Sequence, residues 1–161
     1  MRIGGVSVCV VALVAAVAAP RAAPRPGSSS RTTLFSRETA LVVAINSTRT
    51  VHRLPKLRVD FHLVRAARSH SRDMLRHRYF GHGDFGNRMS RFHVRGRVFA
   101  ENLYWGSGVM GANAAVAGWL ASPPHRANLL DPQLRRVGVA TPVGAFGGFS
   151  TATMVTADFA G

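Results

Sequence analysis

The feature that most limits how this chain can fold is its single cysteine. Cys9 lies in an apolar stretch near the N-terminus, inside a segment that we predict to be removed on export. The exported chain would then contain no cysteine, whereas small secreted domains are often stabilised by disulfides. The folded part must therefore be stabilised by the packing of its core or by a bound metal ion.

The first residues have the pattern of a secretory signal peptide. Arg2 supplies a positive charge, residues 6–14 are apolar, and residues 16–18 read Ala-Val-Ala, which fits a small-x-small cleavage site. The apolar run is shorter than the ~20 residues that a transmembrane span requires, and no later segment reaches that length. We therefore predict a signal peptide over residues 1–18 and a protein that is secreted, extracellular or associated with the cell envelope.

The next segment differs from the rest in composition. Residues 19–35 are rich in Pro, Ser, Gly and Arg and show no periodicity, which predicts a flexible arm. The chain has 161 residues and 47% apolar residues, which fits one folded domain rather than a disordered chain. We expect that domain over residues 36–161.

The chain is strongly basic, with 21 Lys and Arg against 7 Asp and Glu and a net charge of +14. Only Lys56 is a lysine, and such a ratio is more typical of biased codon usage than of one basic function. Together with export, the charge favours contact with an anionic envelope surface over nucleic-acid binding. Any carboxylate chemistry must use one of seven residues, which are Glu38, Asp60, Asp73, Asp84, Glu101, Asp131 and Asp158.

The hydrophobic pattern predicts helices first and strands last. Helical spacing runs from Ser36 to about Arg49 and again over residues 60–78, with Asp60 as the N-cap of the second helix. Glycines then predict a loop over residues 81–87. A third helix is expected over 111–120 and a short fourth one after Ser122-Pro123. Period-two alternation follows over 137–141 and 149–159, around a Gly147-Gly148 turn, so the fold class is α+β.

Four short runs carry most of the functional signal: Tyr-Phe-Gly-His at 79–82, Ala-Glu-Asn-Leu at 100–103, Trp-Leu-Ala-Ser at 119–122, and Ser-Pro-Pro-His-Arg-Ala-Asn-Leu-Leu at 122–130. Their order is accompanied by Asn46, Arg49, Leu57, His70-Ser71 and Met74. With these residues, the segment 41–159 resembles the CAP superfamily of cysteine-rich secretory, antigen 5 and pathogenesis-related proteins (SCP-like domains), and specifically its cysteine-free bacterial branch. The resemblance implies an α-β-α sandwich with an antiparallel hairpin at the C-terminus.

The resemblance also implies a cleft with two histidines and two acids. It places His82, Glu101 and His125 in that cleft, while the fourth position, an acid in many eukaryotic members, is Ser122 here. Two imidazoles and one carboxylate are a ligand set for Zn²⁺ or another divalent cation that leaves one position open. In the alternative interpretation, His82 and His125 hydrogen-bond Glu101 and only hold loops on the core.

Further residues are candidates for the cleft. Asn102 could orient the backbone at Glu101 or satisfy a loop amide. Ser122 could be a nucleophile beside His125, but its place before Pro123 favours a helix cap. For the remaining candidates we favour structural interpretations. His70 and His77 are expected to pack at the edge of the core, and Tyr104, Trp105 and Trp119 within it. We expect a solvated loop rather than an anion-binding rim for four arginines, which are Arg88, Arg91, Arg95 and Arg97.

Two functions follow from these residues. The first is an exported, non-enzymatic module that binds a small molecule, a lipid, a cell-wall fragment or a divalent ion. The second is a metal-assisted hydrolase of peptide or ester bonds, in which the metal on His82, Glu101 and His125 activates water. Ser122 stands where the second acid would be and supplies no general base, and Asp84, two residues after His82, is the only nearby substitute and one that we disfavour.

Overall fold

The structure, a computed structural model, describes residues 33–161, and these form one compact unit. The predicted signal peptide and nearly all of the predicted arm lie outside the described residues. The helices are α1 (Ser36–Val51), α2 (Phe61–His77), α3 (Phe85–Arg91), α4 (Ala112–Ala121) and α5 (Pro123–Leu129). The strands are β1 (Arg58–Val59), β2 (Phe99–Ser107), β3 (Arg136–Ala140), β4 (Val143–Phe146) and β5 (Phe149–Ala160). Within residues 33–161, no helix has the length and hydropathy that crossing a bilayer requires.

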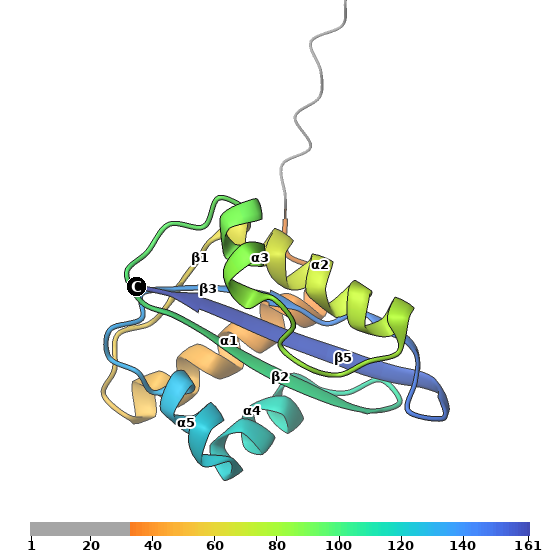
Figure 1. The fold of residues 1–161 in the computed structure, drawn as a ribbon. Helices are drawn as coiled ribbons and strands as arrows, with labels where there is room; N and C mark the ends of the chain where they lie inside the picture. Colours follow the sequence, from red (N-terminus) through yellow and green to blue (C-terminus); the bar gives the residue numbers. More distant parts are fainter. Residues whose placement is uncertain (1–32) are drawn as a thin grey trace, which may run out of the picture. The chain divides into compact units, whose positions relative to one another are not determined.

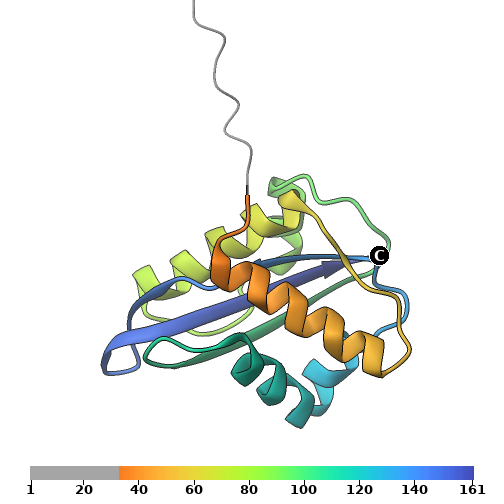
Figure 2. The same ribbon diagram turned by 180° about the vertical axis from the view of Figure 1, so that it is seen from behind.

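The strands form one mixed sheet with the order β1-β3-β5-β2, and β4 pairs with β5 as the C-terminal hairpin. The long strand β5 is central, and β2 lies antiparallel to it at one edge, from Phe99 opposite Ala160 to Ser107 opposite Ala152. Helices α2 and α3 pack on one face of the sheet (Figure 1), and α1, α4 and α5 pack on the other (Figure 2). The predicted α-β-α sandwich is confirmed.

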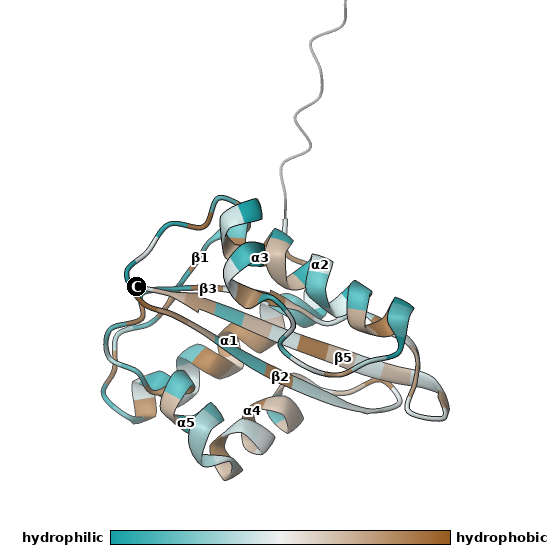
Figure 3. Cartoon of the chain, viewed as in Figure 1, coloured by the Kyte–Doolittle hydropathy of each residue, from teal (hydrophilic) through white to brown (hydrophobic). Residues whose placement is uncertain are grey.

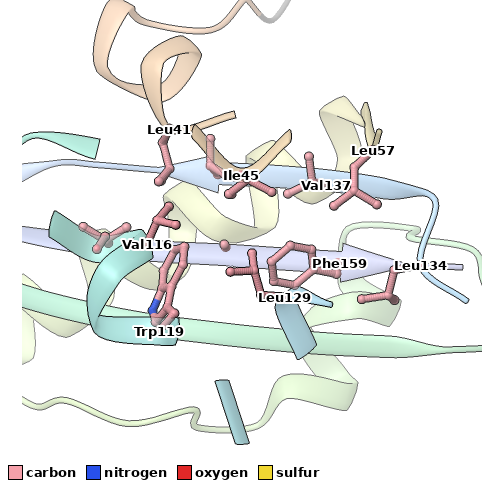
Figure 4. Close-up of a cluster of buried hydrophobic side chains, with 13 residues drawn as sticks. Leu41, Ile45, Leu57, Val116, Trp119, Leu129, Leu134, Val137 and Phe159 are labelled. Carbon is pink, nitrogen blue, oxygen red and sulfur yellow. The ribbon is translucent and has the colours of Figure 1, made fainter. Parts of the chain in front are cut away.

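The larger hydrophobic core lies between the sheet and helices α1, α4 and α5. Its fully buried side chains include Trp119 of α4, Leu41 of α1 and Phe159 of β5 (Figure 4). The Trp119 indole Nε1 also donates a hydrogen bond of 2.9 Å to the carbonyl of Leu103, so its polar atom is satisfied in the core. Packing of this kind supplies the stability that disulfides give many small secreted domains.

A buried arginine fixes the end of α1 to the rest of the domain. Arg49 is fully buried, and its guanidinium donates hydrogen bonds to the carbonyl oxygens of Pro55 (3.0 Å), Leu129 (2.9 Å), Asp131 (3.0 Å) and Leu134 (3.4 Å). Burial lowers the pKa of Arg49 from its ordinary value. The guanidinium therefore connects α1 to α5 and to the segment that leads into β3.

The predicted helices correspond to α1, α2, α4 and α5, and the Asp60 side chain caps α2 by accepting a hydrogen bond from the His62 amide at 2.8 Å. The loop predicted over residues 81–87 is wrong in its second half, because α3 begins at Phe85 with Asp84 as its N-cap. Glycine at 86 weakens the local helix signal. Helix α3 gains its stability from packing instead, since its Met89 is buried against α2.

Candidate functional site

The predicted cleft residues come from three parts of the fold that meet at the edge strand β2. Glu101 and Asn102 lie on β2, His82 lies between α2 and α3, and Ser122 and His125 lie at the start of α5. Because successive side chains of a strand point to opposite faces, Glu101 contacts the layer of α2 and α3, whereas Asn102 contacts α5. Strand β2 therefore carries one half of the site on each face.

The Glu101 carboxylate is the centre of the first half. It is only 5% exposed, and its Oε1 lies 2.7 Å from Nδ1 of His82. Its Oε2 forms an ion pair with the guanidinium of Arg88 and lies 3.7 Å from Nε2 of His70. Both carboxylate oxygens are thus engaged by side chains of this chain, while the His82 side chain remains 55% exposed.

Arg88 was predicted to lie in a solvated loop, and this prediction is wrong. Its guanidinium is buried on α3, donates to the carbonyl of His82 at 3.0 Å as well as to Glu101, and lies 5.3 Å from the centre of the Phe85 ring. Sequence reasoning missed this role because the helix that directs Arg88 inward was read as a loop. The helical spacing of Phe85, Arg88 and Met89 is the signal that could have indicated it.

A second carboxyl group, that of Asp158, lies beside Glu101 on the neighbouring strand β5. The two residues are directly paired across β2 and β5, and Asp158 is completely buried. Burial, followed by the charge of Glu101, raises the pKa of Asp158 well above its ordinary value. Neither Asp158 oxygen faces a hydrogen-bond donor, so an ionised group would be unsatisfied, whereas the protonated acid can donate to Glu101. No motif marks Asp158, and it stood in the sequence only as one of seven acids.

The second half of the site is built around α5. Ser122 is the N-cap residue of α5, as predicted, but its side chain makes no capping hydrogen bond, and its Oγ lies 2.8 Å from Nδ1 of His125 instead. Asn102 donates to the carbonyl of His125 at 2.8 Å, and Asn128 bonds Asn102 at 3.0 Å and the Glu101 carbonyl at 3.2 Å. Asn102 therefore holds α5 against β2. Burial, and then the nearby charge of His82, lower the pKa of His125.

The predicted metal ligands do not fit a divalent cation in this arrangement. Glu101 is hydrogen-bonded to His82 and ion-paired with Arg88, and His125 is paired with Ser122 rather than with Glu101. Among residues 33–161 no three His, Cys, Asp or Glu side chains are grouped so that they could hold a metal ion. Metal binding by His82, Glu101 and His125 stays a prediction.

The other candidate histidines and aromatic residues lie around the site or in the hydrophobic cores. His70 is buried on α2 and bonds the Gly81 carbonyl at 3.0 Å, which fits the packing role expected for it and also places it beside Glu101. Burial lowers the pKa of His70. His77 is exposed and pairs with Asp73 at 2.9 Å. Trp119 and Tyr104 belong to the larger core, while Trp105 packs beside Phe146.

The fold and the site define a class of protein: an α-β-α sandwich with a cluster of histidines and a glutamate at an edge strand. Residues 42–159 match the model of the CAP, cysteine-rich secretory protein, family, and the chain belongs to that family. The resemblance identified from the four sequence runs is confirmed.

Bacterial proteins are among the relatives. The chain is 34% identical over 99 residues to the uncharacterized membrane protein YlbC of Bacillus subtilis. The aligned segment covers 58% of this chain and 28% of YlbC. The chain is 28% identical over 117 residues to the uncharacterized protein YkwD of the same organism, covering 70% of this chain and 45% of YkwD. The chain thus spans less than half the length of either relative.

Solved structures agree with this assignment. An extracellular protein of Bacillus anthracis with an SCP domain superposes with a TM-score of 0.64 at 30% identity, over 77% of this chain and 40% of that one. An outer surface protein of Borrelia burgdorferi superposes with a TM-score of 0.62 over 75% of this chain and 89% of that one. At 22% identity, the second likeness shows the fold alone.

Proposed function

We propose that this chain is an exported binding module that acts outside the cell or at the cell envelope and holds a polar ligand at the β2 edge. The observation that carries the proposal is the internal pairing of Glu101 with Arg88 and His82. Because these charges are compensated within the chain, the group offered to a ligand is the half-exposed imidazole of His82, with His125 nearby. Such a site suits hydrogen bonding to a small molecule or a cell-wall fragment.

The chemistry around Ser122 favours binding over catalysis. A serine nucleophile needs donors for the oxyanion that forms when it attacks a carbonyl. Pro123 and Pro124 follow Ser122 directly, and proline has no backbone N–H, so the first two positions of α5 supply no such donor. The metal-assisted alternative would require Glu101 to leave Arg88. The nearest other acid to His82 in the sequence, Asp84, is exposed, and its carboxylate accepts a hydrogen bond from the Asn87 amide at 3.0 Å as the N-cap of α3.

An exported location has support from several sides. The relative from B. anthracis is an extracellular protein, the relative from B. burgdorferi is an outer surface protein, and the N-terminal pattern predicts export. Loss of Arg2 with the predicted signal peptide lowers the net charge from +14 to +13, and a chain of that charge outside the cell is attracted to anionic envelope surfaces.

The proposal is tested by following the imidazole signals of His82 and His125 by NMR during three titrations. The probes are a soluble muropeptide, zinc chloride and phosphatidylglycerol vesicles. We expect the muropeptide to shift both signals saturably and His82→Ala to abolish the binding, whereas His52→Ala, an exposed histidine at the end of α1, leaves it unchanged.

The zinc titration tests the alternative function, the metal-assisted hydrolase. Binding of one zinc ion that is lost in both His82→Ala and His125→Ala, together with turnover of a peptide or ester, would replace the binding module by a hydrolase. If no probe moves either imidazole signal, the β2 edge is not the ligand site and the proposal fails.

A further inference from the structure

A basic hollow lies on the outer side of α2, where α2 meets α3. Its volume is about 580 Å³, and it is lined by five arginines and one acid: Arg65, Arg68, Arg72, Arg76, Arg91 and Asp73. None of these residues belongs to the cluster around Glu101. On the ribbon coloured by hydropathy, teal hydrophilic positions alternate with brown hydrophobic ones along α2 (Figure 3).

Four of these arginines form a line along one helix. Positions 65, 68, 72 and 76 are separated by three, four and four residues, which is the spacing of side chains on one side of an α-helix. At 1.5 Å per residue, this arginine stripe extends about 16 Å along α2. Arg91, which the sequence predicted to lie in a solvated loop, is instead the last residue of α3 and lines the same hollow.

The acids near the hollow do not neutralise the stripe. Glu38 pairs with Arg68 alone, through bonds of 2.8 and 2.5 Å. Asp73 accepts from Tyr79 at 2.7 Å and pairs with His77 at 2.9 Å. In the part of the chain that the structure describes, the other four arginines of the hollow make no ion pair. The hollow therefore carries uncompensated positive charge.

A smaller hollow extends the surface toward α1. It has a volume of about 270 Å³, shares Arg68 and Arg72 with the first hollow, and adds Arg37 from the first turn of α1. This smaller hollow thus lies beside the two middle arginines of the stripe, and Glu38, the partner of Arg68, lines it as well. A single small anion would occupy only a fraction of a surface of this length.

The chemistry of the surface selects its partner. Guanidinium groups match the oxygens of phosphate groups and bind them through paired hydrogen bonds. A row of guanidinium groups in a furrow between two helices suits a linear chain of phosphates more than a flat membrane surface. We infer that the arginine stripe of α2, with Arg91, binds a linear phosphodiester polymer.

The inference rests on the proposed function only in assuming that the chain is exported and so encounters the polymer outside the cell. The binding itself is measured with a fluorescent poly(glycerol phosphate) oligomer, titrated at several salt concentrations. The test variant carries Arg72→Gln and Arg76→Gln. The matched control carries Lys56→Gln and Arg58→Gln, which remove the same charge from exposed residues outside both hollows.

Neutralising two phosphate contacts should weaken binding by about tenfold and make the plot of log affinity against log salt less steep by about one to two units. The control should change affinity by less than about twofold, because exposed charges outside the contact are screened. Thermal melts show whether each variant is folded. His82→Ala and His125→Ala should bind the oligomer like the parent chain, so failure of the cleft proposal and failure of this one are distinguishable.

Three results would overturn the inference. Equal weakening in the control and the test variant would mean that net charge alone attracts the polymer. Phosphatidylglycerol vesicles that bind while the soluble oligomer does not would make the stripe a membrane contact. Single-stranded DNA that binds more tightly than poly(glycerol phosphate) would make it a nucleic-acid site.

Discussion

The buried ion pair between Arg88 and Glu101 can be tested by its removal. Arg88→Met keeps an apolar stem on α3 but leaves the Glu101 carboxylate, which is 5% exposed, without its cation. Breaking a buried pair by removing one partner costs about 3–5 kcal/mol. The Arg88 Nε is buried without a partner, and its loss relieves some of that cost. We therefore expect a loss near the lower limit, about 3 kcal/mol, or about 10 °C in melting temperature for a domain of this size.

Urea unfolding at pH 7 measures this loss. The informative control is the double variant Arg88→Met with Glu101→Gln, in which neither charge remains. Its destabilisation should fall short of the sum of the single variants by about 2–3 kcal/mol. A single-variant loss below about 1 kcal/mol, or strict additivity, would refute a strong pair at this site.

Three further predictions concern the acid beside the pair, a crowded glycine and the buried arginine of α1. The folded state holds a proton on Asp158, whose pKa burial raises, and the unfolded chain releases it above about pH 4. Stability should therefore fall as the pH rises above 4, by up to about 1.4 kcal/mol per pH unit, and Asp158→Asn should remove this slope in urea titrations from pH 4 to 7. Gly138→Ala would place a Cβ 2.1 Å from a backbone nitrogen of α2 and should lower the free energy of unfolding by about 3 kcal/mol or more. In the control Gly86→Ala the new Cβ meets open space, and the free energy of unfolding should rise by up to about 1 kcal/mol. Similar melting temperatures of the two variants in thermal melts would contradict this. Arg49→Lys should lower the free energy of unfolding in urea by about 2–3 kcal/mol, because an ammonium group cannot reach four separate carbonyls. An unchanged urea midpoint would show that those hydrogen bonds contribute little.

The sequence by itself determined four of the five helices of residues 33–161 and the family. The periodicity of α2 and the cap at Asp60 depend on neighbours within a few residues, so they can be read locally. The ordered runs around His82, Glu101 and His125 identified the CAP family. The lack of cysteine beyond Cys9 left core packing or a bound metal ion as the means of stabilisation, and the structure shows a buried core cluster around Trp119.

Only the tertiary structure decided what surrounds the carboxylate. Arg88 reaches Glu101 from a helix that the glycine pattern did not predict, and Asp158 lies beside Glu101 through strand register. The hydroxyl of Ser122 bonds His125 instead of capping α5, because the imidazole lies within its reach. These contacts join segments whose partners no local pattern specifies, and their geometry follows from how the layers pack. Whether Glu101 is a free ligand or half of an ion pair is therefore a property of the fold rather than of the motif that contains it.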